Sequence, residues 1–202
     1  MRFTRNTFLV RAAVLAAMVG SAAFSFGQQE SGKSFSSIKI KNFGQMDERF
    51  YRGAQPKESD YRDLATLGIK TVIDLQDNPT SYEKRDAEAL GMRYINIPMS
   101  DSEYPRAEQI AMFLKLADDP ATGKFFVHCA GGRHRTGVMG AVYRFTHNQW
   151  NFDQAYAEMK QYDFYTRWGH GALKQYVQDY AQHMPANQTG AAAATTATKS
   201  NK

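Results

Sequence analysis

One segment of this 202-residue sequence combines residue types that could do covalent chemistry on a phosphate. It holds the single cysteine, Cys129, and five residues separate that cysteine from Arg135. A thiolate is a strong nucleophile, and a planar guanidinium can hold two phosphoryl oxygens at once, which a lysine cannot do. The spacing lets the backbone between the two residues curl around one anion. The segment therefore predicts a phosphate site with a nucleophilic sulfur beside it.

The elements expected around this cysteine would position these groups. Residues 124–127 read Lys-Phe-Phe-Val and favour a β-strand, and a helical pattern begins near Thr136. A helix N-terminus attracts anions, and Gly131 and Gly132 permit the positive φ that a tight loop requires. The helix dipole, the loop N–H groups and the nearby arginine would lower the cysteine pKa from about 8.5 into roughly the 3.5–7.5 range. The N–H groups expected to bind phosphate are those of Ala130, Gly131, Gly132, Arg133, His134 and Arg135.

The motif from His128 to Gly137, His-Cys-x-x-Gly-x-x-Arg-Thr-Gly, resembles the active-site signature of the protein-tyrosine-phosphatase superfamily, on its dual-specificity side. Phe50–Pro56 and Thr71–Leu75 are similar to the opening strand and the second strand of bacterial and atypical dual-specificity phosphatases. The similarity spans about Ile38 to Tyr180. The end of the motif also resembles the Gly-Lys-His-Arg-Thr-Gly loop of fungal and plant enzymes that act on inositol pyrophosphates, with arginine in place of the lysine.

This resemblance implies roles for individual residues. Cys129 would be the nucleophile and Arg135 would hold the phosphoryl oxygens. The family's general acid is an aspartate on a loop roughly thirty residues before the cysteine, and Asp101 lies 28 residues before it. Glu103 is the competing carboxylate. The acid would protonate the leaving oxygen and then activate water.

Two further residues of the motif would support the nucleophile. His128 is expected to orient the loop through its ring nitrogens rather than to transfer protons. Thr136 could hydrogen-bond the sulfur and help it leave, or could simply cap the helix that follows. No His, Cys or Asp cluster has the spacing of a metal site, so we expect the reaction to use no metal and no cofactor.

Three classes of function remain open at this stage. The first is a phosphatase that acts on proteins phosphorylated on tyrosine, serine or threonine, or on inositol phosphates or pyrophosphates at the same site. The second is a sulfurtransferase or an arsenate reductase, which would not need the aspartate loop, and an arsenate reductase typically has further cysteines. The third is a non-catalytic phosphate-binding module, which would not need the cysteine as a nucleophile.

Strand and helix patterns alternate along the chain, which predicts a single α/β domain with a largely parallel sheet flanked by helices. We place this phosphatase-like domain at residues 28–184. The expected strands are 50–52, 70–75, 92–97 and 124–128. The expected helices are 58–67, 79–90, 105–116, one from about 136, 151–161 and 172–182.

Both ends of the sequence differ in composition from this domain. Residues 1–27 have a basic start and an apolar stretch too short to span a bilayer, which indicates a signal peptide. Its three arginines have no acidic neighbours and supply over half of the formal charge of +5, so a nucleic-acid partner is not indicated. The protein would be exported, to the periplasm or the medium, without a membrane span. Residues 185–202 form a low-complexity tail that we expect to be disordered.

Overall fold

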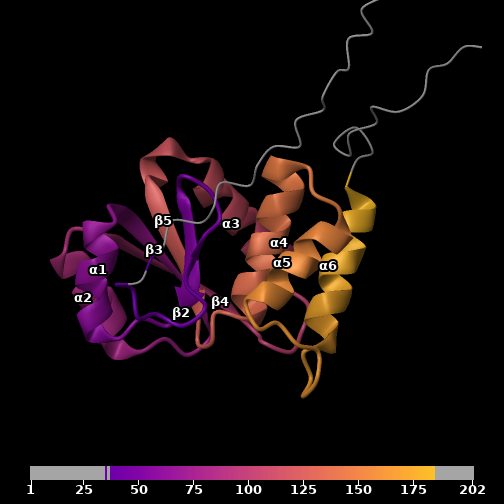
Figure 1. The fold of residues 1–202 in the computed structure, drawn as a ribbon, viewed down its shortest axis with the longest axis horizontal. Helices are drawn as coiled ribbons and strands as arrows, with labels where there is room; N and C mark the ends of the chain where they lie inside the picture. Colours follow the sequence, from indigo (N-terminus) through magenta and orange to yellow (C-terminus); the bar gives the residue numbers. More distant parts are fainter. Residues whose placement is uncertain (1–34, 36, 185–202) are drawn as a thin grey trace, which may run out of the picture. The chain divides into compact units, whose positions relative to one another are not determined.

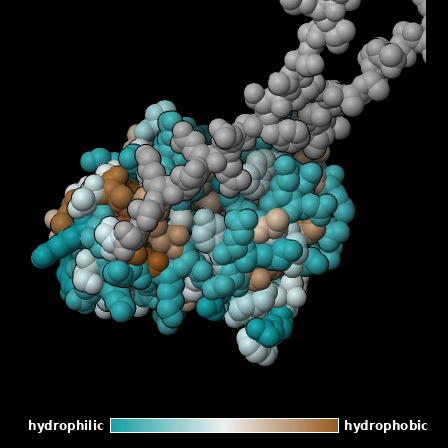
Figure 2. All heavy atoms as spheres, viewed as in Figure 1, coloured by the Kyte–Doolittle hydropathy of each residue, from teal (hydrophilic) through white to brown (hydrophobic). Residues whose placement is uncertain are grey.

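The structure is a computed structural model, and it describes residue 35 and residues 37–184. The expected signal peptide at 1–27 and the expected tail at 185–202 lie outside the described residues, as does the start of the domain predicted from residue 28. Within the described part, no helix is long and apolar enough to cross a membrane. The face shown in Figure 2 is mostly hydrophilic, with hydrophobic residues gathered in small areas.

A five-stranded sheet forms the centre of the domain (Figure 1). Its strands are β1 (Gly44–Gln45), β2 (Phe50–Ala54), β3 (Ile69–Gln76), β4 (Arg93–Met99) and β5 (Lys124–Cys129). Their order in the sheet is β1-β2-β5-β3-β4. The short strand β1 pairs antiparallel with β2, and the other pairs are parallel. The predicted α/β class with a largely parallel sheet is confirmed.

The central strand β5 determines which residues meet at the edge where the strands end. Phe125, Phe126 and Val127 have no exposed surface, as expected for a parallel strand covered on both faces. The register pairs Ala54 of β2 with Cys129, and Asp74 of β3 with His128. The carboxyl ends of β2, β3 and β5 therefore lie side by side around the cysteine.

The described part of the chain has six α-helices: α1 (Tyr61–Thr66), α2 (Ser81–Ala89), α3 (Ala107–Asp118), α4 (His134–Asn148), α5 (Phe152–Gln161) and α6 (Gly171–His183). Two 3₁₀ turns cover Glu58–Asp60 and Pro120–Thr122. Helices α1 and α2 pack on one face of the sheet, and α3 and α4 pack on the other (Figure 1). Helices α5 and α6 pack against α4, so α4 is buried along most of its length.

The expected elements are all present, and strand β1 is present in addition. Most boundaries differ from the expected ones by one or two residues. Pro98 does not end its strand, because β4 lies at the edge of the sheet, where a missing N–H is tolerated. The third helix begins at Ala107 rather than at Pro105, because the N–H of Arg106 is capped by the Gln109 side chain at 2.7 Å. The helix expected at 58–67 begins as a 3₁₀ turn.

Candidate active site

The cysteine lies at the junction that the sequence predicts. Cys129 is the last residue of β5 and is 3% exposed, and α4 begins at His134. The loop of residues 130–133 and the first two residues of the helix carry the N–H groups expected to bind phosphate, at the N-terminus of a 15-residue helix. The N-terminus of a helix of this length favours an anion through its free N–H groups and the helix dipole.

Two side chains outside the motif hold the loop in a shape that suits an anion. Asn42 Nδ2 donates to the carbonyl of Gly131 at 2.8 Å, and Arg52 Nη2 donates to the carbonyl of Gly132 at 2.5 Å. A peptide carbonyl and the N–H of the next residue point in opposite directions, so fixing these carbonyls on the outside turns N–H groups inward. Of the two adjacent glycines, only Gly132 has a positive φ, at 65°.

Arg52 is itself buried, with its guanidinium 3.9 Å from the centre of the Tyr162 ring. Burial lowers the pKa of Arg52 to about 10, which leaves the side chain charged at neutral pH. Neither Asn42 nor Arg52 was identified as a site residue from the sequence. Arg52 belongs to the Phe50–Pro56 segment that carries the family resemblance. That resemblance was the one sequence feature that could have pointed to Arg52 as a site residue.

The surroundings of Cys129 favour its thiolate. Burial by itself would raise the thiol pKa, but hydrogen bonding from the hydroxyl and backbone N–H of Thr136, the charge of Arg135 and the N–H of Arg133 outweigh it and hold the pKa of Cys129 below its ordinary value. The Thr136 hydroxyl is buried and has no other hydrogen-bond partner among the described residues. It is therefore available to the sulfur.

Arg135 is anchored at one corner of its guanidinium. Its Nη1 donates to the Asp77 carboxylate at 2.9 Å and to the carbonyl of Met99 at 3.1 Å. Its Nε is buried without a hydrogen-bond partner within the described part of the chain. The edge made by Nε and Nη2 is thus oriented to take two oxygens of one phosphoryl group. Asp77 was missed in the sequence, although it directly follows a strand, β3, that was predicted.

His128 lies away from the phosphate loop. Its ring has no exposed surface and sits between Glu83 of α2 and Asp74 of β3, so it cannot touch a substrate. These three side chains offer ligand atoms within 4.8 Å of one another, which is the grouping expected of a metal site. The carboxylate oxygens, however, already accept hydrogen bonds from neutral donors, and the imidazole Nε2 lies 3.0 Å from Glu83 Oε2, so the cluster fits a proton better than a metal ion.

The predicted acid loop lies beside the start of α4. Asp101 and Glu103 are both exposed on the bend after β4. The carbonyl of Asp101 accepts a hydrogen bond from His170 Nδ1 at 2.7 Å, and the His170 ring stacks on the ring of His134 at 3.6 Å between centroids. Burial and the neighbouring His170 lower the pKa of His134 to about 4, so His134 is neutral at physiological pH.

The connection between α5 and α6 also contributes aromatic and cationic side chains near the loop. The guanidinium of Arg133 lies 5.9 Å from the Tyr165 ring, and that of Arg167 lies 5.4 Å from it. Trp168 is 75% exposed. This stretch has no periodic hydrophobic pattern, and its place beside the phosphate loop follows only from how α5 and α6 pack on α4.

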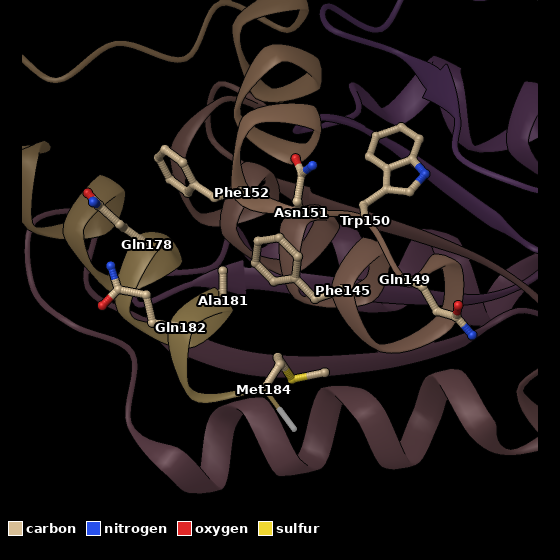
Figure 3. A pocket seen from close by; sticks show the side chains of 9 residues that line it. All are labelled: Phe145, Gln149, Trp150, Asn151, Phe152, Gln178, Ala181, Gln182 and Met184. Carbon is tan, nitrogen blue, oxygen red and sulfur yellow. The ribbon is translucent and has the colours of Figure 1, made fainter. Parts of the chain in front are cut away.

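A hollow of about 220 Å³ lies elsewhere, between the end of α4, the start of α5 and the end of α6 (Figure 3). Its walls include Phe145, Trp150, Phe152 and Met184, and none of its lining side chains is ionisable or nucleophilic. The chemistry that the sequence predicts therefore belongs to the Cys129 loop and not to this hollow.

Together, a central parallel sheet and an N–H-lined loop between β5 and α4, with a cysteine at its start and an arginine at its end, define the fold and loop of cysteine-dependent phosphatases. The chain belongs to the DSP-PTPase phosphatase family, whose members are hydrolases: the family model described as "DSP-PTPase phosphatase fused to NAD+ Kinase" matches residues 28–178.

Individual proteins similar to this chain are also described as phosphatases. The chain is 29% identical over 126 residues to the putative tyrosine-protein phosphatase OCA1 of Mycosarcoma maydis, covering 60% of this chain and 79% of that protein. It is 29% identical over 127 residues to the dual specificity protein phosphatase TpbA of Pseudomonas aeruginosa, covering 61% of this chain and 55% of TpbA. It therefore spans only about half of the TpbA sequence.

Solved structures share the fold at lower identity. The crystal structure of P. aeruginosa TpbA has a TM-score of 0.61 at 24% identity, covering 73% of this chain and 88% of that chain. The core catalytic domain of the PP-IP phosphatase SIW14 from S. cerevisiae, in complex with citrate, has a TM-score of 0.63 at 20% identity, covering 72% and 88%.

Proposed function

We propose that this protein is a phosphatase that hydrolyses phosphate monoesters through a phosphocysteine intermediate. The observation that carries the proposal is the pairing of a thiol of lowered pKa with an oriented guanidinium edge on one anion-binding loop. Family membership supports it independently.

In the first step the Cys129 thiolate attacks phosphorus, so that an S–P bond forms and the P–O bond to the leaving group breaks. Asp101 gives its proton to the leaving oxygen. Arg135 and the loop N–H groups hold the charge on the other phosphoryl oxygens. In the second step Asp101 takes a proton from a water molecule, the oxygen of that water bonds to phosphorus, and the S–P bond breaks. Thr136 then hydrogen-bonds the departing thiolate.

The first candidate substrates are proteins phosphorylated on tyrosine, serine or threonine. Relatives described as a tyrosine-protein phosphatase and as a dual specificity protein phosphatase support this choice. The exposed ring of Trp168 beside the loop would offer apolar contact to a phosphotyrosine side chain or its neighbours.

A second candidate class is the inositol phosphates and pyrophosphates. Arg133 lies in the phosphate loop, and Arg167 stands near it on the α5–α6 connection. Two cations beside one phosphate site suit a substrate with several phosphates. The yeast protein of similar fold is described as a PP-IP phosphatase.

The test of the enzyme class is hydrolysis of para-nitrophenyl phosphate by the wild type and by Cys129→Ser. A phosphatase should lose all detectable turnover in the variant, and rapid acid quench of the wild type with labelled substrate should trap phosphate on the cysteine. A binding module would show no turnover in either protein, and a sulfurtransferase would transfer sulfur without hydrolysing the ester.

The substrate class is decided by comparing phosphopeptides with inositol hexakisphosphate and its pyrophosphates, in the wild type and in Arg167→Gln. If multiply phosphorylated inositols are the substrates, kcat/KM for them should fall in the variant while para-nitrophenyl phosphate turnover changes little. Equal effects on both would count against the inositol alternative.

A further inference from the structure

Arg52 is a buried cation that lies behind the phosphate loop. It is 1% exposed and shares a face of β2 with Phe50, whose ring belongs to the core between the sheet and α4. Its Nη2 donates to the carbonyl of Gly132 at 2.5 Å, and its guanidinium lies 3.9 Å from the centre of the Tyr162 ring. Arg52 thus contacts the loop through a carbonyl oxygen and not through the N–H groups.

The charge of Arg52 has no carboxylate to balance it. Within the described part of the chain no acid forms an ion pair with Arg52, and its Nε is buried without a hydrogen-bond partner there. The acid whose charge acts on it, Glu158 of α5, is already bound by Arg144 at 2.6 Å. The Tyr162 hydroxyl keeps its proton, because burial raises its pKa. A buried cation without an anion is costly, so this charge calls for a partner.

The peptide between Gly132 and Arg133 connects this charge to the inside of the loop. Its carbonyl accepts the hydrogen bond from Arg52, and its N–H points the other way, towards the sulfur of Cys129. A cation on the carbonyl side polarises the peptide and strengthens its N–H as a donor. The charge of Arg52 also acts through space on an anion held by the loop, because water screens buried charges only weakly.

The charge of the expected ligand requires more than one cation. A phosphate monoester carries a charge of about −1.5 to −2 at neutral pH. Arg135 can balance one negative charge with the edge that faces the ligand. Arg52 stands on the opposite side of the loop backbone, so it can balance the second charge without touching an oxygen of the ligand. A loop between two guanidinium groups is therefore suited to a dianion.

We propose that Arg52 is a positioning residue of the phosphate site, which turns the N–H of the Gly132–Arg133 peptide towards the ligand and supplies the second positive charge that makes the loop select dianions. The inference rests on the proposed function for its meaning in catalysis, but it concerns which anions the free loop binds. Asn42 holds the neighbouring carbonyl of Gly131 with a neutral amide, so it shares the first task and not the second.

The test is the affinity of the loop for tungstate and perrhenate, measured by calorimetry at constant ionic strength. Both are tetrahedral oxyanions of similar size, but tungstate is a dianion and perrhenate a monoanion. A Cys129→Ser background removes turnover and reaction with the sulfur. Arg52→Met should lose about tenfold in affinity for each unit of charge on the ligand, so tungstate binding should fall about a hundredfold and perrhenate binding about tenfold.

Two further variants separate charge from loop shape. Arg52→Lys keeps the charge and should keep the ratio of the two affinities near that of the parent. Asn42→Gly removes a neutral donor to the same loop and tolerates the positive φ of 52° at that position. It should weaken both anions by a similar factor and leave the ratio in place.

Equal losses for the two anions in Arg52→Met, or a ratio that falls as far in Arg52→Lys as in Arg52→Met, would overturn the proposal. So would a parent protein that binds no tungstate. If Arg52→Met does not fold, the neutral Arg52→Gln replaces it with the same expected change in ratio. A wild type that hydrolyses no phosphate ester but shows this charge selectivity would refute the proposed function and leave the inference intact. Ester hydrolysis with an unchanged ratio in Arg52→Met would refute the inference alone.

Discussion

At the scale of single residues, a substitution of Arg135 can separate the two contributions of its guanidinium, the bidentate hydrogen-bond geometry and the positive charge. Lysine would keep the positive charge but lose the Nε–Nη2 edge and the anchor to Asp77. We expect Arg135→Lys to lower kcat by about 10²–10³-fold and to weaken vanadate binding as well, because the same donors serve both. Steady-state kinetics with vanadate inhibition measure the two effects. Arg106→Lys, at an exposed arginine, is the matched control and should change neither.

The general acid is also a question of one residue. Asp101→Asn should slow esters with poor leaving groups, such as alkyl phosphates and phosphotyrosine, by about 10²–10⁴-fold, and should slow an activated aryl phosphate far less. Vanadate affinity should stay nearly intact, because Asp101 acts only on the leaving oxygen. The basic limb of the pH–rate profile should flatten, since that limb reports loss of the acid's proton.

Glu103→Gln is the companion variant, because Glu103 lies on the same exposed bend. If it shows the leaving-group dependence and Asp101→Asn slows all esters equally, the acid is Glu103 and the assignment made here is wrong.

At the scale of elements, the loop between β5 and α4 depends on its close approach to β2. Gly132 has a φ of 65°, and a Cβ there would collide with the backbone of Gly53 and Ala54. We expect Gly132→Ala to displace the loop and lower kcat/KM by about a hundredfold. Gly131→Ala is the matched control, because its Cβ would meet only the Arg133 side chain at 3.6 Å. Comparable losses in the two variants would show that the left-handed conformation is not what the loop needs.

The connection between α5 and α6 ties the acid loop to the start of α4. His170 donates to the carbonyl of Asp101 and stacks on His134. His170→Ala should therefore loosen the acid loop and slow esters with poor leaving groups by about ten- to a hundredfold, with little change in vanadate affinity. His183→Ala is a close control, since His183 Nδ1 also bonds a backbone carbonyl, that of Asp179 in α6. A loss of vanadate affinity in His170→Ala would mean that this residue supports the phosphate loop instead.

At the scale of the whole molecule, we propose that the protein is exported and that residues 1–27 are removed. The family match begins at residue 28, directly after this segment. Mass spectrometry of the protein from fractionated cells should find a shortened N-terminus outside the cytoplasm. A version without residues 2–27 should stay in the cytosol. An unprocessed full-length chain in the cytosol would contradict the proposal.

The sequence by itself determined the local parts of this protein. The strand–loop–helix around Cys129, the alternation of strands and helices and the family resemblance all depend on residues close together in the chain, where period and turn chemistry act directly. The positive φ of Gly132 and the cap at Asn151, whose side chain accepts from the Gln154 N–H at 3.0 Å, are of the same kind.

Only the tertiary structure decided which distant residues surround that loop. Asn42, Arg52, Asp77 and His170 come from separate segments and meet near the Cys129 loop because β2 and β3 pair in parallel with β5 and because α5 and α6 pack on α4. Parallel strands are joined by crossovers of a dozen residues or more, so neighbours at one edge of the sheet are far apart in sequence. The hydrophobic pattern tells which residues are buried but not the order of the strands, and it is that order which places Glu83 against His128.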